Sequence, residues 1–148
     1  MCTEVEEFID TLTEDLKKLL LHDFVASKQS RYFTEVKENL ATGEMVLVQD
    51  FAENFAFVIQ DAAQAFHWNN DQATLFPTVV YYRENNEVKH YCLLGISDCL
   101  KHDSVSVYMF QEKIIEHLKE KFTCIEKIYY FSDGALQQFK NKKNFANL

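Results

Sequence analysis

The sequence predicts an α/β domain with a mixed sheet in the order β-β-β-α-β, preceded by an N-terminal helical region. Two observations carry this prediction. Apolar residues recur at helical spacing near the amino end and again over residues 104–122. Short runs of β-branched and aromatic residues mark strands at 45–50, 76–82, 89–97 and 128–131. Because a helix links the last two strands, we expect it to cross over the sheet.

Size and composition favour one domain without a linker. The chain has 148 residues with one Pro and three Gly, which is enough for a single core. We expect residues 1–42 to form the helical region and residues 43–148 to form the core. The net charge of −8 argues against a general attraction to nucleic acid.

Several features favour an intracellular protein. The amino end lacks the basic and apolar segments of a signal peptide, and no apolar run approaches membrane-spanning length. We therefore expect no membrane contact. Four cysteines without a Cys-x-x-Cys pair fit a reducing compartment.

The amino-terminal segment carries one apolar stripe. Thr3 and Glu6 fit a capping box, and a first helix is predicted to extend to about His22. The period continues less regularly to Leu40, so one long helix and a helical hairpin are both compatible with the pattern. Residues 41–43 are expected to stop it. Such a stripe can pack within the protein or serve as an interface for a second copy or another partner.

Three predicted strands follow. The run from Met45 delivers Asp50 at its carboxyl end. Residues 55–61 look extended, whereas residues 62–71 match neither period. Polar residues 84–87 separate the runs at 76–82 and 89–97, which predicts an antiparallel hairpin.

The last predicted elements are a helix and a strand. Ser104 or Asp103 can cap the helix, whose apolar positions keep helical spacing to Phe122. The unbroken apolar run 128–131 is typical of a central strand that is buried on both faces. Asp133 would stand at the carboxyl end of that strand, and Gly134 marks a sharp exit.

Four motifs in this order resemble those of DDE-type, transposon-derived transposases. They are Leu47-Val-Gln-Asp-Phe-Ala-Glu-Asn54, Gln64 with His67-Trp68-Asn69, Ile96-Ser-Asp98 with His102-Asp103, and Tyr130-Phe-Ser-Asp-Gly134 with Gln138-Phe-Lys-Asn141. The similarity extends from Gly43 to Leu148. It implies a ribonuclease H-like fold and a relationship to metal-dependent DNA strand cleavage and transfer.

The resemblance implies catalytic and metal-binding roles for Asp50 and Asp133. In this family the first two acids of the triad end the first and fourth strands and share Mg²⁺ or Mn²⁺ ions. The third acid lies on a later helix, and the sequence stops at Leu148 before such a helix can be recognised. We therefore expect a core that is incomplete at its carboxyl end and inactive alone, with a nuclear location if transposase function is retained.

Other side chains have competing interpretations. Lys140, Lys142 and Lys143 could contact a DNA phosphate, and His67 and Trp68 could contact a displaced nucleotide, although a solvated helix end and a buried pair explain them as well. For Glu53 and Asp61 a solvated loop position is favoured over a role as metal ligands. For Asp98, His102 and Asp103 a helix-capping role is favoured over a catalytic one, and a zinc site is rejected.

Two other functions remain open from the sequence. The first is a non-enzymatic interaction or dimerisation module that uses the acidic N-terminal helices, including pairing with a second copy. The second is an active nuclease whose third acid comes from within this chain.

Overall fold

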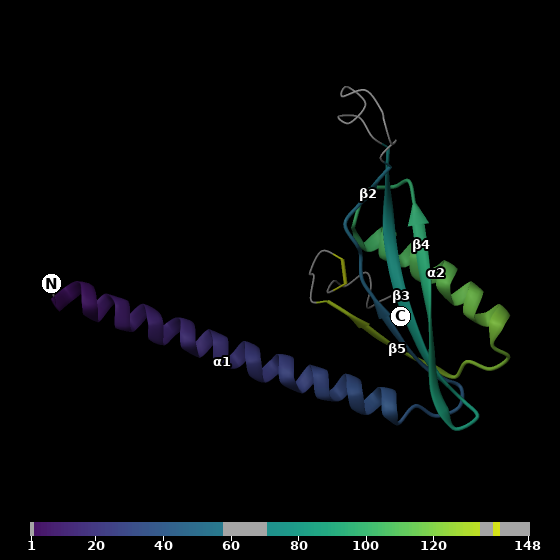
Figure 1. The fold of residues 1–148 in the computed structure, drawn as a ribbon, viewed down its shortest axis with the longest axis horizontal. Coiled ribbons are helices and arrows are strands. Elements are labelled where there is room, and N and C mark those ends of the chain that lie inside the picture. The colour runs from purple at the N-terminus through teal and green to yellow at the C-terminus, as the bar shows by residue number, and fades with distance from the viewer. Residues whose placement is uncertain (1, 58–70, 134–137, 140–148) are drawn as a thin grey trace. The chain divides into compact units, whose positions relative to one another are not determined.

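The computed structural model describes residues 2–57, 71–133 and 138–139. The chain divides into two compact units, Met1–Asn39 and Leu40–Leu148. The element order is α1 (Cys2–Glu38), β1 (Glu44–Gln49), β2 (Phe55–Ala56), β3 (Gln72–Glu84), β4 (Glu87–Ser97), α2 (Ser104–Lys121) and β5 (Lys127–Ser132) (Figure 1).

The first unit is one helix. α1 continues without a break from Cys2 to Glu38, so the sequence folds as one long helix and the hairpin alternative is wrong. α1 begins at Cys2, one residue before the position predicted for its cap. The helix also ends three residues before the predicted stop at 41–43. Gly43 has a φ of +88°, a conformation that glycine adopts at little cost.

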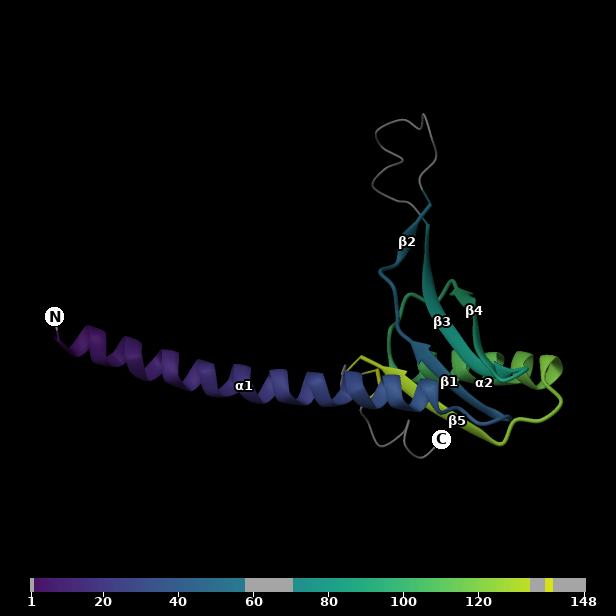
Figure 2. The same ribbon diagram turned by 60° about the horizontal axis from the view of Figure 1, so that its bottom comes forward.

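The second unit contains a mixed sheet of five strands. The path through the sheet is β2-β3-β1-β5, and β4 pairs with the other side of β3. β1 lies antiparallel to β3 and parallel to β5 (Figure 2). The predicted α/β class and mixed sheet are therefore confirmed. The extended segment predicted at 55–61 is a strand only at Phe55–Ala56, and residues 58–61 lie outside the described part of the chain.

The predicted hairpin joins β3 to β4. Asn85 and Asn86 form its turn, with φ values of 51° and 67°. A two-residue turn with positive φ at both positions matches the twist of the flanking strands, and Asn tolerates this conformation better than most residues. The hairpin prediction is confirmed, and its local chemistry explains why.

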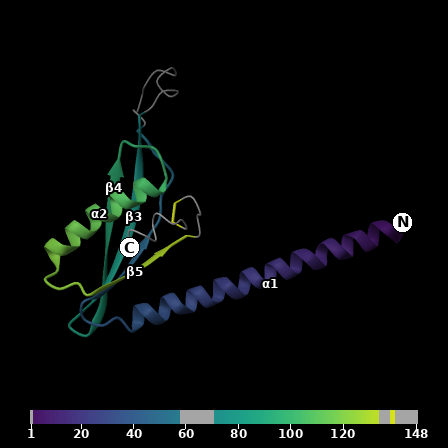
Figure 3. The ribbon, with the colours of Figure 1, turned by 180° about the vertical axis from the view of Figure 1, so that it is seen from behind.

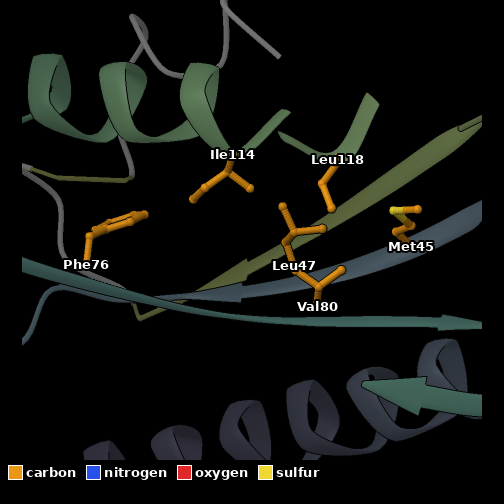
Figure 4. Close-up of a cluster of buried hydrophobic side chains, with 6 residues drawn as sticks. All are labelled: Met45, Leu47, Phe76, Val80, Ile114 and Leu118. Carbon is orange, nitrogen blue, oxygen red and sulfur yellow. The ribbon is translucent and has the colours of Figure 1, made fainter. Parts of the chain in front are cut away.

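The core lies between the sheet and α2. The helix lies behind the strands in Figure 1 and in front of them in Figure 3, so it covers one sheet face. Of the two predicted caps, Asp103 is the one used, and α2 begins at Ser104. Side chains from β1, β3 and α2 meet at this interface (Figure 4): Met45, Leu47, Phe76, Val80, Ile114 and Leu118. Burial of this apolar surface is the main source of stability.

β5 differs from its prediction. The apolar residues Ile128–Phe131 are only half-buried, and among the described residues β5 pairs with β1 alone. The strand is therefore last in the sheet order, not central. β1 instead lies between β3 and β5, and its residues Met45, Val46 and Leu47 are buried. A short apolar run cannot distinguish the two cases, because burial depends on neighbours that are distant in the sequence.

β3 is longer than predicted and contains Pro77. The carbonyl of Pro77 accepts a hydrogen bond from the Asp50 N–H at 3.4 Å. Because N–H and C=O of one strand residue point to the same side, the missing N–H of Pro77 also faces the chain beyond the end of β1. The reciprocal bond from residue 77 to the Asp50 carbonyl cannot form, which fits the end of the β1–β3 pairing at Gln49 and Thr78.

Candidate metal centre

The two predicted metal ligands follow neighbouring strands. The β1–β5 register pairs Gln49 with Ser132, and Asp50 and Asp133 are the next residue on each strand. Because the strands are parallel, both aspartates follow their strands at the same end of the sheet. Adjacent strands lie about 4.8 Å apart. Both aspartates are exposed.

Asp50 makes a local hydrogen bond. Its Oδ1 accepts from the backbone N–H of Phe51 at 2.8 Å. This bond goes to the next residue, whereas the Asx turn common at strand ends reaches two residues on. An ionised carboxylate offers about four acceptor sites on two oxygens, so one hydrogen bond leaves acceptor capacity for a cation.

Aromatic packing holds the residue after Asp50. The Phe51 ring stacks on His102, with centroids 4.4 Å apart and an interplanar angle of 8°. It also meets Phe76 edge-on at 4.8 Å. These contacts attach the chain beyond β1 to the core, so they restrict the backbone at Asp50.

A polar network strengthens the same attachment. The Asn54 side-chain oxygen lies 2.8 Å from His102 Nε2 and 3.0 Å from the hydroxyl of Thr74, which is fully buried. The Thr74 hydroxyl also lies 2.8 Å from the Cys99 carbonyl oxygen. Because an amide oxygen can only accept, we assign the His102 proton to Nε2. In the sequence, His102 and Asn54 each belonged to one of the quoted motifs, whereas nothing singled out Thr74.

Asp103 acts as a helix cap. Its Oδ1 accepts from the backbone N–H groups of Ser106 at 2.9 Å and Val105 at 3.1 Å. The hydrogen bond from Ser106 is the main reason that the pKa of Asp103 lies below its ordinary value, with smaller help from Val105 and Lys101. The capping role favoured by the sequence is therefore confirmed.

Asp98 lies too far along the sheet to join Asp50. Asp50 lies level with Pro77, which pairs with Leu94 on β4, and Asp98 comes four residues later. At about 3.3 Å per residue this is about 13 Å along the strands, with β3 also in between. Asp98 instead lines an open hollow of about 800 Å³ with Phe57, Asp71 and Leu100.

A buried polar pair lies directly behind the carboxylates. Gln49 and Thr78 face each other on β1 and β3, and both are almost completely buried. Gln49 Oε1 accepts from Gln111 Nε2 of α2 at 3.0 Å. Gln49 Nε2 and Thr78 Oγ1 have no hydrogen-bond partner among the described atoms. The only signal in the sequence was a glutamine in the inward-facing series of Met45 and Leu47.

The remaining predicted residues have separate outcomes. Glu53 is described and exposed, three residues after Asp50. Across residues 2–57, 71–133 and 138–139, no three His, Cys, Asp or Glu side chains are grouped closely enough to hold a metal. The other predicted contacts lie outside these ranges: Asp61, His67, Trp68, Lys140, Lys142 and Lys143.

Comparison with known proteins gives one match. A family model described as a domain of unknown function, DUF8701, matches residues 29–148. No curated protein and no solved structure matches the chain. None of the helices in the described ranges is both long enough and apolar enough to cross a membrane.

Proposed function

The chain belongs to the DUF8701 family, and we propose that it is a transposase-derived domain with a ribonuclease H-like core that binds a divalent cation through Asp50 and Asp133. The observation that supports the proposal is the β1–β5 register, in which Gln49 and Ser132, the residues just before the two aspartates, are paired. The motifs around both residues resemble those of DDE-type transposases.

The sheet order supports the proposed fold. Without the two-residue strand β2, the strands run β4-β3-β1-β5 across the sheet. Three antiparallel strands therefore precede a helix on one face and a strand parallel to the first. This is the arrangement that the resemblance implies, with an acid after the first and the last of these strands.

The donor set fits Mg²⁺ or Mn²⁺. Both are hard cations that prefer carboxylate oxygens, and Mg²⁺ commonly keeps several water ligands beside one or two carboxylates. Asp50 and Asp133 would hold one ion at the carboxyl ends of β1 and β5. When bound, such an ion can polarise a phosphate oxygen and lower the pKa of a bound water.

We propose binding without strand cleavage by this chain alone. Two-metal phosphodiester chemistry needs further oxygen ligands for the second ion. Among the described residues Asp50 and Asp133 are joined by no third acid, because Asp103 is a helix cap and Asp98 lies several strand positions away. The site therefore suits one cation.

Titration calorimetry of the whole chain with MnCl₂ tests the proposal. We expect saturable binding of about one ion, and either Asp50→Asn or Asp133→Asn should weaken it at least about tenfold. Asp98→Asn is the matched control, since it removes the same charge from an exposed acid farther along the sheet. The absence of saturable binding would contradict the proposal, as would an equal weakening in Asp98→Asn.

A plasmid-nicking assay with Mn²⁺ tests the proposed lack of cleavage. We expect the native chain to nick no faster than its Asp133→Asn variant. Faster nicking by the native chain would mean that an acid of this chain completes the site, which is the active-nuclease alternative.

We propose DNA as the partner of this site, with the carboxyl-terminal lysines contacting its phosphates. Replacing Lys140, Lys142 and Lys143 by glutamine should weaken binding of a short duplex. It should also flatten the dependence of log K on log[salt] by about 0.9 for each phosphate that the variant no longer neutralises. An unchanged affinity and slope would exclude that role.

A further inference from the structure

α1 presents a row of large apolar side chains that its own unit does not cover. The unit Met1–Asn39 consists of this helix alone within the described residues. Five members of the row recur every four residues, and between 45 and 69% of each is exposed. They are Phe8, Leu12, Leu16, Leu20 and Phe24. Helices of this kind gain most of their stability from packing, so the row needs an occupant.

The row is symmetric about Leu16. Going outward from Leu16, a leucine and then a phenylalanine follow in both directions, at four and eight residues. Residues at i and i+4 form a ridge on a helix surface, and ridges of one helix pack into the grooves of another. When two copies of this ridge meet antiparallel at Leu16, Phe8 of each lies level with Phe24 of the other. The row therefore presents the same order of side chains to a second copy that runs antiparallel.

Charged residues of α1 are also arranged about Leu16, with acidic residues before it and basic residues at matching positions after it. Residues 4–15 contain six acidic and no basic residues, whereas residues 17–31 contain four basic and one acidic. Asp10, Glu14 and Asp15 precede Leu16 by six, two and one positions. His22, Lys18 and Lys17 follow it at the same separations.

Orientation decides whether these charges attract or repel. An antiparallel pair centred on Leu16 brings each of these three acidic positions level with its mirrored lysine or histidine of the other copy. A parallel pair in register brings each acid level with the same acid. Charges within about 8 Å interact at physiological ionic strength, so the antiparallel pair is favoured.

We propose that two copies of this chain associate through α1 as an antiparallel pair centred on Leu16. The pair is two-fold symmetric and therefore closed, so the same surface serves both copies and no further copy can add to it. The association uses α1 alone and is independent of the metal site.

Light scattering and sedimentation of the whole chain test the association. We expect a dimer whose dissociation constant rises at least about 100-fold in Leu16→Glu, because the substitution removes two central leucines per pair. Leu21→Glu is the matched control, since Leu21 is 66% exposed but lies off the row. Its dissociation constant should change less than about threefold, and circular dichroism should show equal helix content in both variants. A monomeric native chain, or an equal weakening in Leu21→Glu, would overturn the proposal.

Distances between spin labels test the orientation. In a chain with its four cysteines replaced by serine, labels on Glu7→Cys should lie about 27 Å apart along the axis of an antiparallel pair. In a parallel pair they would lie at the same level, about one helix diameter apart. Labels on Lys17→Cys are the control, because that position is close to its copy in either orientation. A short distance at position 7 would overturn the antiparallel arrangement.

Discussion

α1 and the sheet unit use the same kinds of apolar residue in opposite ways. In the sheet unit, Leu47, Val80 and Leu118 are fully buried between β1, β3 and α2. In α1, leucines of the same size are about half to two-thirds exposed. An apolar stripe therefore identifies a helix face, whereas the surface that covers it depends on other elements or other chains. Substitutions in each region can sharpen or break this contrast.

Truncation of a leucine should give the largest difference between the two regions in the free energy of unfolding. Leu118→Ala opens a cavity beneath α2 and should lower the free energy of unfolding by about 2–5 kcal/mol. Leu21→Ala in α1 removes the same atoms from an exposed position and should change it by less than about 0.5 kcal/mol. Urea unfolding of both variants measures the difference. Similar decreases would mean that α1 is covered within one chain.

Addition of a single methyl group should disturb the sheet unit at Gly95. A Cβ there would lie 2.5 Å from Cδ1 and 2.7 Å from Cε1 of Phe110, whose ring stacks on Phe76 at 4.8 Å. Gly95→Ala should therefore cost about 1–3 kcal/mol, because the ring must leave its packed position. Thermal unfolding measures this cost. An unchanged melting temperature would show that Phe110 relaxes freely.

Two buried threonines of β3 should respond with opposite sign. The Thr74 hydroxyl lies within hydrogen-bond distance of the Asn54 side-chain oxygen and the Cys99 carbonyl oxygen and can donate its one proton to either, so Thr74→Val should lower the free energy of unfolding by about 1–3 kcal/mol. The Thr78 hydroxyl has no partner among the described atoms, so Thr78→Val should raise it by up to about 1 kcal/mol. Urea unfolding distinguishes them. A decrease in Thr78→Val would indicate that a water molecule satisfies this hydroxyl.

The pH dependence of the α2 cap should give the weakest response. Hydrogen bonds from Ser106 and Val105 lower the pKa of Asp103 from its ordinary value of 3.8 in the folded chain. Its stabilising effect is therefore complete above that value and is lost as the pH falls through the lower, folded pKa. The melting temperature of the native chain should exceed that of Asp103→Ala at pH 6, and the gap should close on acidification. A gap that stays constant on acidification would contradict this role of the Asp103 carboxylate.

Local chemistry explains the predictions that hold. The β3–β4 hairpin follows from two asparagines that tolerate positive φ, and α2 follows from an aspartate cap before an amphipathic run. These signals act over a few residues, so they can be recognised without knowledge of the fold.

The predictions that fail depend on distant neighbours. The run Ile128–Phe131 looked like a central strand, but it is half-buried because its pairing in the described residues is with β1 alone. Gln49 and Thr78 showed no sign that they face each other behind Asp50. Burial of a side chain depends on which strands and helices approach it, and hydrogen-bond pairing between strands is largely independent of side-chain identity.

The kinds of elements, the hairpin turn, the α2 cap and the presence of an aspartate after each of two strands follow from the sequence alone. The parallel pairing of β1 with β5, which leaves Asp50 and Asp133 directly after their last pair, emerges only in the folded chain. Each element forms through contacts a few residues apart, and these can be recognised in the sequence. The pairing of the residues just before the two aspartates depends instead on backbone hydrogen bonds between strands that most of the domain separates in sequence.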